Sequence, residues 1–314
     1  MIALGLDTSN YTTSAAFFDG VNGCNAGRLL EVKPGEKGLR QSDALFQHVK
    51  ALPGRLEELR AQGLGEISAV AASTRPRAVA GSYMPCFLAG ESLGESLSAV
   101  LNVPFYAVSH QQGHLAAAAW SAGRMDLLDA PFLAWHLSGG TTELLYVDPE
   151  GVNVNARRIG GTTDISAGQL MDRTGVLLGL AFPAGKALDE LSQSCAHWPK
   201  PFPRKVTDLE FSLSGVENKV KELTEKGEDP AAIAAFAVGT MVKAVRDTTL
   251  AARELFPGLP LLCSGGVASN SHLRQELTDA CGAVFAPPQY STDNAMGVAI
   301  LCHRLWSNDK EESV

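Results

Sequence analysis

The sequence predicts an α/β fold with an internal duplication, because strand-like and helix-like stretches alternate and one local pattern occurs twice. In this pattern a short apolar strand ends at a turn of small polar residues, and a second strand follows. The pattern occupies residues 2–18 and, about half a chain later, residues 132–147. A third turn, Ser264-Gly265-Gly266, connects an apolar strand to a helix-like stretch. Backbone N–H groups of such turns are accessible to anions, so these turns are candidate binding sites.

The individual elements follow from the apolar residues along the chain. The first strand ends at Asp7, and the turn Thr8-Ser9-Asn10 leads into a strand at residues 14–18. The second copy has its first strand at residues 132–137, followed by the turn Ser138-Gly139-Gly140-Thr141-Thr142. Apolar periodicity or a helix-like composition predicts helices at residues 41–62, 86–101, 111–122, 164–180, 230–255 and 271–280.

The composition argues against several classes of protein. With 314 residues, the chain is long enough for two lobes that each bury a core. Its formal net charge of -8 has the wrong sign for binding nucleic acid through bulk charge, so such binding needs local patches or a partner protein. We expect no secretory signal, because the N-terminus has no basic region and no long apolar region. We expect no membrane association, because no apolar run approaches the ~20 residues of a membrane span. The cysteines are dispersed without a CxxC pair, which is typical of reduced thiols in a cytoplasmic protein.

Two histidines four residues apart are the sharpest chemical signal in the chain. On a helix, His110 and His114 would lie on one face, where they could bind a metal ion together. In the HExxH motif of zinc proteases a glutamate after the first histidine acts as general base, but this chain has Gln111 there. The pair is therefore compatible with a metal but not with that hydrolysis. The alternative is a pair of exposed histidines on a helix surface.

Two further residues could complete a metal site. His136 ends an apolar strand directly before Ser138-Gly139-Gly140, so it either packs in the core or points at whatever this turn binds. Asp293 precedes an Ala/Val/Ile-rich helix, where its alternative role is that of an N-cap. Three imidazoles and one carboxylate would suit iron, zinc or manganese.

Several segments, taken together and in this order, resemble the Kae1/TsaD (Gcp) family, whose members take part in forming threonylcarbamoyladenosine in tRNA. Each segment alone is a modest signal, but the set spans nearly the whole chain. The matching segments are residues 110–114 (His-x-x-x-His), 138–140 (Ser-Gly-Gly), 164–173, 177–180, 183–185, 211–215 (Phe-Ser-x-Ser-Gly), 265–270 (Gly-Gly-Val-Ala-x-Asn) and 292–294 (Thr-Asp-Asn).

The resemblance implies the actin–hexokinase–Hsp70 (ASKHA) fold, in which two duplicated RNase H-like lobes surround a central cleft. We expect an N-terminal lobe at residues 1–125 and a C-terminal lobe at residues 126–290. Residues 291–314 are expected to form a C-terminal helix and tail that return to the N-terminal lobe. The cleft is expected to bind an adenylate, or ATP or AMP.

The resemblance also implies an activity. An acyltransferase of this family moves the threonylcarbamoyl group from threonylcarbamoyl-AMP to the N6 amine of the adenosine beside the anticodon of tRNA. It is expected to use one divalent metal ion, iron or zinc, and partner subunits of the bacterial threonylcarbamoyl-transfer complex. Two alternatives stay open, namely a small-molecule carbamoyltransferase that uses a carbamoyl-adenylate, and a non-catalytic nucleotide-binding paralogue that serves as a partner protein.

Site residues are implied motif by motif. The resemblance implies His110, His114 and Asp293 as metal ligands, with His136 at the position of a tyrosine ligand in archaeal members. No catalytic base or nucleophile is assigned. The expected substrate-binding residues of the nucleotide and acyl-adenylate pocket are His136, Leu137, Ser138, Gly139, Gly140, Asp172, Gly185, Asp189 and Asn270.

The first loop departs from the family pattern. Family members usually open with Glu-Thr-Ser-Cys-Asp-Glu, and this chain has Asp7-Thr8-Ser9-Asn10-Tyr11-Thr12, so two acidic residues are absent. Ser109 stands where an asparagine often precedes the first histidine, and Thr141 and Glu143 replace common residues after Ser-Gly-Gly. A divergent paralogue with altered activity is therefore the alternative to a working enzyme.

Overall fold

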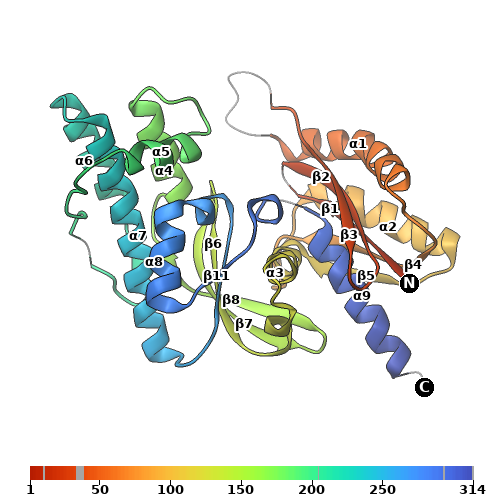
Figure 1. Cartoon of the computed structure of the whole chain (residues 1–314). Helices are drawn as coiled ribbons and strands as arrows, with labels where there is room; N and C mark the ends of the chain where they lie inside the picture. Colours follow the sequence, from red (N-terminus) through yellow and green to blue (C-terminus); the bar gives the residue numbers. More distant parts are fainter. Residues whose placement is uncertain (10, 33–38, 204, 293, 313–314) are drawn as a thin grey trace. The chain divides into compact units, whose positions relative to one another are not determined.

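The computed structural model contains two compact units, each an α/β structure with helices packed on a sheet (Figure 1). It describes residues 1–9, 11–32, 39–203, 205–292 and 294–312. The first unit comprises Met1–Ala130, Asp148–Ala156 and Thr292–Val314, and the second comprises Pro131–Val147 and Arg157–Ser291. The α/β class is confirmed. The sequence did not predict that Asp148–Ala156, the tip of a hairpin, belongs to the first unit.

The first unit is built around a mixed sheet. Its strands are β1 (Ile2–Thr8), β2 (Thr12–Phe18), β3 (Gly23–Leu29), β4 (Ile67–Arg75) and β5 (Phe105–Ser109). Its helices are α1 (Gln41–Ala61), α2 (Leu88–Leu101), α3 (His110–Ser121) and α9 (Met296–Glu311), with short 3₁₀ turns at Pro85–Phe87 and Met125–Asp129. The strand order is β3-β2-β1-β4-β5, with β1 antiparallel to β2 and parallel to β4.

The central strand β1 is buried on both faces, which explains why it reads as a continuous apolar run. On one face, Leu4 and Leu6 belong to a core with Leu52 of α1 and residues of α2. On the other face, Gly5 lies against α9, where a Cβ atom would be 2.3 Å from the backbone nitrogen of Ala299. A larger residue at this position would push the helix off the sheet.

Helices α3 and α9 cross at two glycines. A Cβ atom at Gly297 would lie 1.7 Å from the carbonyl oxygen of Gly113, and one at Gly113 would lie 3.2 Å from Cγ2 of Val298. The close approach of the two backbones requires glycine at position 297. This crossing holds the first two turns of α3, which carry the histidine pair, against the start of α9.

The second unit has a larger sheet with the order β11-β10-β6-β7-β8-β9. Its strands are β6 (Phe132–Leu137), β7 (Thr142–Glu150), β8 (Asn153–Thr162), β9 (Glu210–Phe211), β10 (Leu261–Ser264) and β11 (Val284–Phe285). Its helices are α4 (Ala167–Leu177), α5 (Gly185–Gln193), α6 (Ser214–Glu225), α7 (Pro230–Leu255) and α8 (Ser271–Cys281), with 3₁₀ turns at Gly266–Ser269 and Pro288–Tyr290. Among the described residues, no helix is both long and apolar enough to cross a membrane.

The strand orders confirm the predicted duplication. In the first unit the sheet reads β3-β2-β1-β4-β5, and the second sheet contains the matching run β8-β7-β6-β10-β11. In each copy an antiparallel pair, β1 with β2 or β6 with β7, is followed by parallel neighbours. The helix expected at residues 164–180 is confirmed as α4, three residues shorter at each end, and α5 is a further helix that was not predicted.

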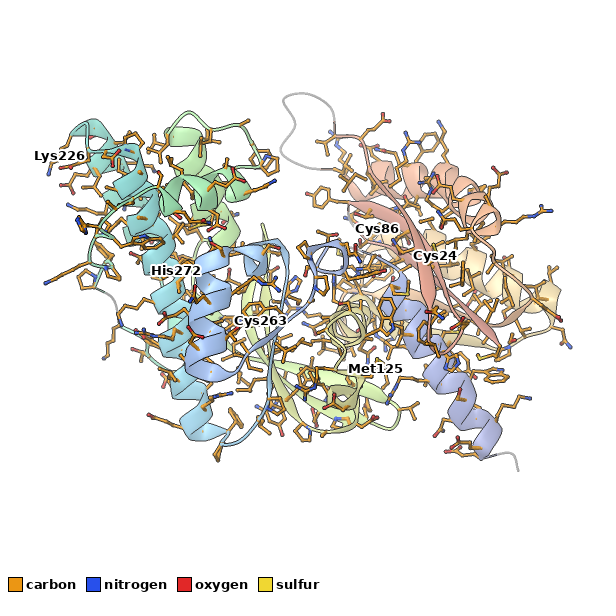
Figure 2. The ribbon with its side chains drawn as sticks, in the orientation of Figure 1. Cys24, Cys86, Met125, Lys226, Cys263 and His272 are labelled. Atoms are coloured by element: carbon orange, nitrogen blue, oxygen red, sulfur yellow. The ribbon has the colours of Figure 1, made fainter. Side chains whose placement is uncertain are left out.

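The cysteines behave as isolated thiols. All six lie in the described part of the chain and are free; Cys24 and Cys195 are half-buried and the others are buried. Figure 2 marks Cys86 in the first unit and Cys263 in the second. Burial, with a further contribution from the charge of Asp7, raises the pKa of Cys86 to about 11, so this thiol stays protonated at neutral pH.

Candidate functional site

The histidine pair lies at the start of α3, where side chains fix the end of the helix. Ser109 is the N-cap: its Oγ accepts a hydrogen bond from the Gln112 backbone at 3.2 Å, and Gln112 Oε1 accepts one from the Ser109 backbone at 2.8 Å. This reciprocal capping box satisfies N–H groups that a helix start leaves unpaired. Gln112 Nε2 also donates to the carbonyl of Val154 at 2.7 Å, which ties α3 to the hairpin tip of the same unit.

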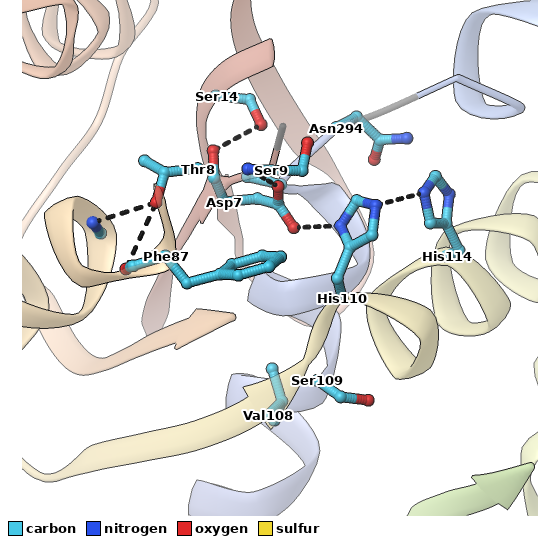
Figure 3. Close-up of polar contacts among 12 residues, drawn as sticks. Asp7, Thr8, Ser9, Ser14, Phe87, Val108, Ser109, His110, His114 and Asn294 are labelled. Carbon is cyan, nitrogen blue, oxygen red and sulfur yellow. Dashed lines mark hydrogen bonds and ion pairs between the residues drawn. The ribbon is translucent and has the colours of Figure 1, made fainter. Parts of the chain in front are cut away.

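The two imidazoles converge through their ε nitrogens (Figure 3). The Nε2 atoms of His110 and His114 are 2.9 Å apart, and the ring centroids are 4.3 Å apart at 76°. Both residues are half-buried, so they are not the exposed pair of the alternative interpretation. Nitrogen atoms from successive helical turns that face one point fit two positions of a tetrahedral or octahedral metal site.

The structure adds Asp7 to this pair. Its Oδ2 lies 2.7 Å from Nδ1 of His110, although the two residues are far apart in the sequence. Asp7 is 1% exposed and stands at the carboxyl end of the central strand β1. The signal that could have found it is an acidic residue that ends a buried strand directly before a turn of small polar residues.

The described residues do not test the other two predicted metal ligands. Asp293 lies outside the described residues, and its neighbour Asn294 accepts a hydrogen bond from the Met296 backbone at the start of α9 at 3.1 Å. His136 belongs to β6 in the second unit, with its Nδ1 3.5 Å from Oγ of Ser264. The described part of the chain holds no group of three or more potential metal ligands. Asp293 and His136 as ligands therefore stay predictions.

In the second unit, the glycine turn between β6 and β7 adjoins the start of α4. Ser166 is the N-cap of α4 and donates from its Oγ to the carbonyl of Gly139 at 2.6 Å. A Cβ atom at Gly168 would lie 2.5 Å from the carbonyl oxygen of Ser138, so only glycine allows this approach. At Gly139 and Gly140, by contrast, a Cβ atom would meet nothing within 4 Å. An open turn beside a helix N-terminus has the features of an anion site.

A second glycine turn packs beside the first. Gly265 follows β10 with a φ of +98°, and a Cβ atom there would lie 2.1 Å from the carbonyl oxygen of Leu137. Leu137 itself is buried at the end of β6. Because β6 and β10 are parallel neighbours, their turns meet at the same edge of the sheet, where α/β proteins bind ligands.

The remaining predicted residues surround this edge through hydrogen bonds. Asp189 of α5 accepts from Asn270 Nδ2 at 2.8 Å and from the Ser271 backbone at 3.0 Å. Asn270 also caps α8, since its Oδ1 accepts from the Leu273 backbone at 2.9 Å. These contacts fix the start of α8 to α5.

Asp172 and Gly185 lie at the junction of α4 and α5. Asp172 Oδ1 accepts from the Ala184 backbone at 2.8 Å, directly before Gly185 opens α5. A Cβ atom at Gly185 would meet nothing within 4 Å, so this helix start is open. The predicted substrate-binding residues of the second unit thus lie in three local groups, namely the turn at residues 137–140, the contact of Asp189 with Asn270, and the junction of Asp172 and Gly185.

The chain has the ASKHA fold, as the solved structures that superpose on it show. The (R)-2-hydroxyglutaryl-CoA dehydratase component A of Acidaminococcus fermentans superposes with a TM-score of 0.55 at 14% identity, covering 98% of this chain and 99% of that one. A ROK family glucokinase from Streptomyces griseus gives 0.52 at 13% identity, covering 97% and 100%. Full-length HypF gives 0.60 at 14% identity, covering 98% of this chain and 55% of HypF.

Sequence relatives identify the family within this fold. The family model for TsaD, tRNA N6-adenosine threonylcarbamoyltransferase, matches residues 35–300. A relative of that name from Granulibacter bethesdensis is 32% identical, covering 96% of this chain and 88% of the relative. Another, from Thermus thermophilus, is 35% identical, covering 82% and 78%. The chain belongs to the tRNA N6-adenosine threonylcarbamoyltransferase family.

Proposed function

We propose that this protein transfers a threonylcarbamoyl group from threonylcarbamoyl-AMP to the N6 amine of the adenosine beside the anticodon of tRNA. The observation that carries the proposal is the family match across residues 35–300, which spans the motifs of both units. In this reaction the amine nitrogen bonds to the carbamoyl carbon, the bond from that carbon to the phosphate oxygen breaks, AMP leaves, and the amine loses a proton.

The second unit would bind the adenylate. The open Gly139-Gly140 turn offers its backbone to phosphate oxygens. At the N-terminus of α4, the N–H groups of Ala167 and Gln169 already donate to Thr142 and Ser166, so this helix start supports the turn instead of binding the phosphate directly. One carboxylate oxygen of Asp172 accepts a hydrogen bond from the Ala184 backbone N–H, and the other would accept one from a ribose hydroxyl. Asp189 already accepts from Asn270 and Ser271, so we assign it to shaping the wall of the site.

The first unit would hold a divalent metal ion, iron or zinc, through His110 and His114. The fit rests on the convergence of the two Nε2 atoms and on the neutral nitrogen donors that such ions accept. Asp293 and His136 are proposed as further ligands. When bound, the ion supplies Lewis-acid polarisation of an acyl carbonyl. In this proposal His110 and His114 hold the ion, and each presents an unprotonated Nε2 atom to it.

Partner subunits and the cytoplasm belong to the same proposal. A chain with a net charge of -8 gains little from bulk attraction to tRNA, so partners are expected to supply positive charge. The free, unpaired cysteines are those of a protein in a reducing compartment.

The direct test is transfer to tRNA read by nucleoside mass spectrometry. The protein is incubated with threonylcarbamoyl-AMP, unmodified tRNA and bacterial partner subunits, beside His114→Ala and a control variant, His272→Ala. His272 packs against Trp198 in the second unit, with ring centroids 4.3 Å apart and the rings tilted by 44°, and it has no assigned role. We expect product with the wild type and His272→Ala, and a large loss with His114→Ala. A wild type that binds AMP but never modifies tRNA would refute the proposal.

The first loop favours one second candidate, a small-molecule carbamoyltransferase. Tyr11, 42% exposed, and Thr12, 6% exposed, occupy positions where the family pattern has acidic residues. A change of charge at this loop would suit a different acceptor. Release of AMP from a carbamoyl-adenylate in the presence of small amines or thiols, without tRNA modification, would identify this activity.

A further inference from the structure

A buried carboxylate lies behind the histidine pair (Figure 3). Asp7 is 1% exposed; its Oδ2 is 2.7 Å from Nδ1 of His110, and its Oδ1 accepts from the Ser9 backbone at 3.0 Å. We infer that Asp7 is a positioning residue for the metal pair, which fixes the ring of His110 so that its Nε2 faces His114 with a lone pair. This inference rests on the metal site of the proposed function.

The contact with Asp7 decides which ring nitrogen of His110 carries the hydrogen. An ionised carboxylate only accepts hydrogen bonds, so the hydrogen on His110 lies on Nδ1. A neutral imidazole then carries its lone pair on Nε2, the atom 2.9 Å from Nε2 of His114. Metal-binding histidines commonly donate their second ring N–H to a carboxylate, which sets the tautomer and strengthens the ligand.

Asp7 acts through His110 rather than on the ion itself. The δ and ε nitrogens lie on different edges of the ring, and Asp7 contacts the δ edge while His114 contacts the ε edge. Figure 3 shows the three side chains in a row, with His110 in the middle. A carboxylate in this place orients a ligand without taking a coordination position.

Two neighbouring side chains, Phe87 and His48, favour the contact of Asp7 with His110. Phe87 packs against the His110 ring, with centroids 5.9 Å apart and tilted by 53°, and limits its rotation. The nearby His48 is fully buried, with Nδ1 2.7 Å from Oγ1 of Thr13. Burial lowers the pKa of His48, so this ring is neutral near pH 7 and does not compete with His110 as a cationic partner.

Three variants of the full-length protein test the inference. Asp7→Asn keeps the size of the side chain but can donate as well as accept, so it no longer dictates the tautomer of His110. Asp7→Glu keeps the carboxylate, and glutamate is the residue of the family pattern at this position. The matched control is Ser14→Ala, because Ser14 Oγ donates to the backbone carbonyl of Asp7 at 3.3 Å and not to its carboxylate.

The first readout is the tautomer of His110 in the metal-free protein, measured by long-range ¹H–¹⁵N NMR. We expect hydrogen on Nδ1 in the wild type, Asp7→Glu and Ser14→Ala, and a mixed or reversed tautomer in Asp7→Asn. The second readout is the Kd for Co²⁺, titrated by visible absorbance. We expect about 10- to 100-fold weaker binding for Asp7→Asn, the range for loss of such a carboxylate. Ser14→Ala should bind as the wild type does.

The outcomes separate this inference from the proposed function. Co²⁺ binding by Asp7→Asn as tight as the wild type, or a wild-type His110 without hydrogen on Nδ1, overturns the role of Asp7 and leaves tRNA transfer standing. A wild type that binds no Co²⁺ overturns the metal pair and this inference together. Co²⁺ binding that depends on Asp7, in a protein that never modifies tRNA, supports the inference and refutes the proposed function.

Discussion

Gly168→Ala is expected to destabilise the second unit because the added methyl group has no room. Its Cβ would lie 2.5 Å from the Ser138 carbonyl oxygen and 2.9 Å from the Gly139 nitrogen, which are backbone atoms of the turn. Overpacking costs ~1–3 kcal/mol, and backbone atoms that cannot rotate away put this site near ~3 kcal/mol. Alanine is favoured over glycine inside a helix by ~1 kcal/mol. The free energy of unfolding should therefore fall by about 2 kcal/mol.

The matched control for this prediction is Gly54→Ala in α1. A Cβ atom at Gly54 would meet nothing within 4 Å, so the same substitution should raise the free energy of unfolding by up to ~1 kcal/mol. Urea unfolding of both variants, followed by fluorescence and circular dichroism, measures the difference. AMP titration of Gly168→Ala should also show weaker binding, because the Ser138-Gly139-Gly140 turn must shift. If both variants were stabilised equally, the steric account of this turn would be refuted.

Three further perturbations have expected outcomes. His110→Ala or His114→Ala should each lower the zinc or iron content of the purified protein at least tenfold, measured by elemental analysis; metal retained in both variants would reject the ligand assignment. Thr249→Val removes the partner of the buried Trp135 Nε1, which lies 2.8 Å from Thr249 Oγ1, and should cost ~1–3 kcal/mol in thermal unfolding; an unchanged Tm would contradict this. Burial alone would raise the pKa of Asp164, but hydrogen bonds from Ser212, Ser214 and backbone N–H groups lower it from 3.8 to about 2. Its stabilising contribution is therefore complete above about pH 4 and is lost as the pH falls toward 2; Asp164→Asn should flatten stability in that window, and an unaltered acid transition would argue against it.

Local patterns predicted the elements that depend on neighbouring residues. The two strand–turn–strand segments follow from short runs of apolar residues and small turns, and the structure confirms both and repeats their strand order. The spacing of His110 and His114 placed them one helical turn apart, because helical periodicity is a property of adjacent residues. The helix predicted at residues 164–180 is α4, three residues shorter at each end, whereas α5 was not predicted, because nine residues are too few for an apolar helical period to stand out.

Contacts between distant residues were decided only by the tertiary structure. Asp7 meets His110 because β1 and β5 end at the same edge of one sheet, and that edge depends on strand order and register. Asp189 of α5 contacts Asn270 at the start of α8, although the two residues are far apart in the sequence. Contacts of this kind leave no periodic pattern in the sequence, so they could not be predicted from it. The amino-acid sequence by itself determined the duplicated α/β class and the histidine pair. The contact between Asp7 and this pair depends on strand packing, which only the tertiary structure shows. A buried carboxylate needs a hydrogen-bond partner, and the fold places His110 beside it.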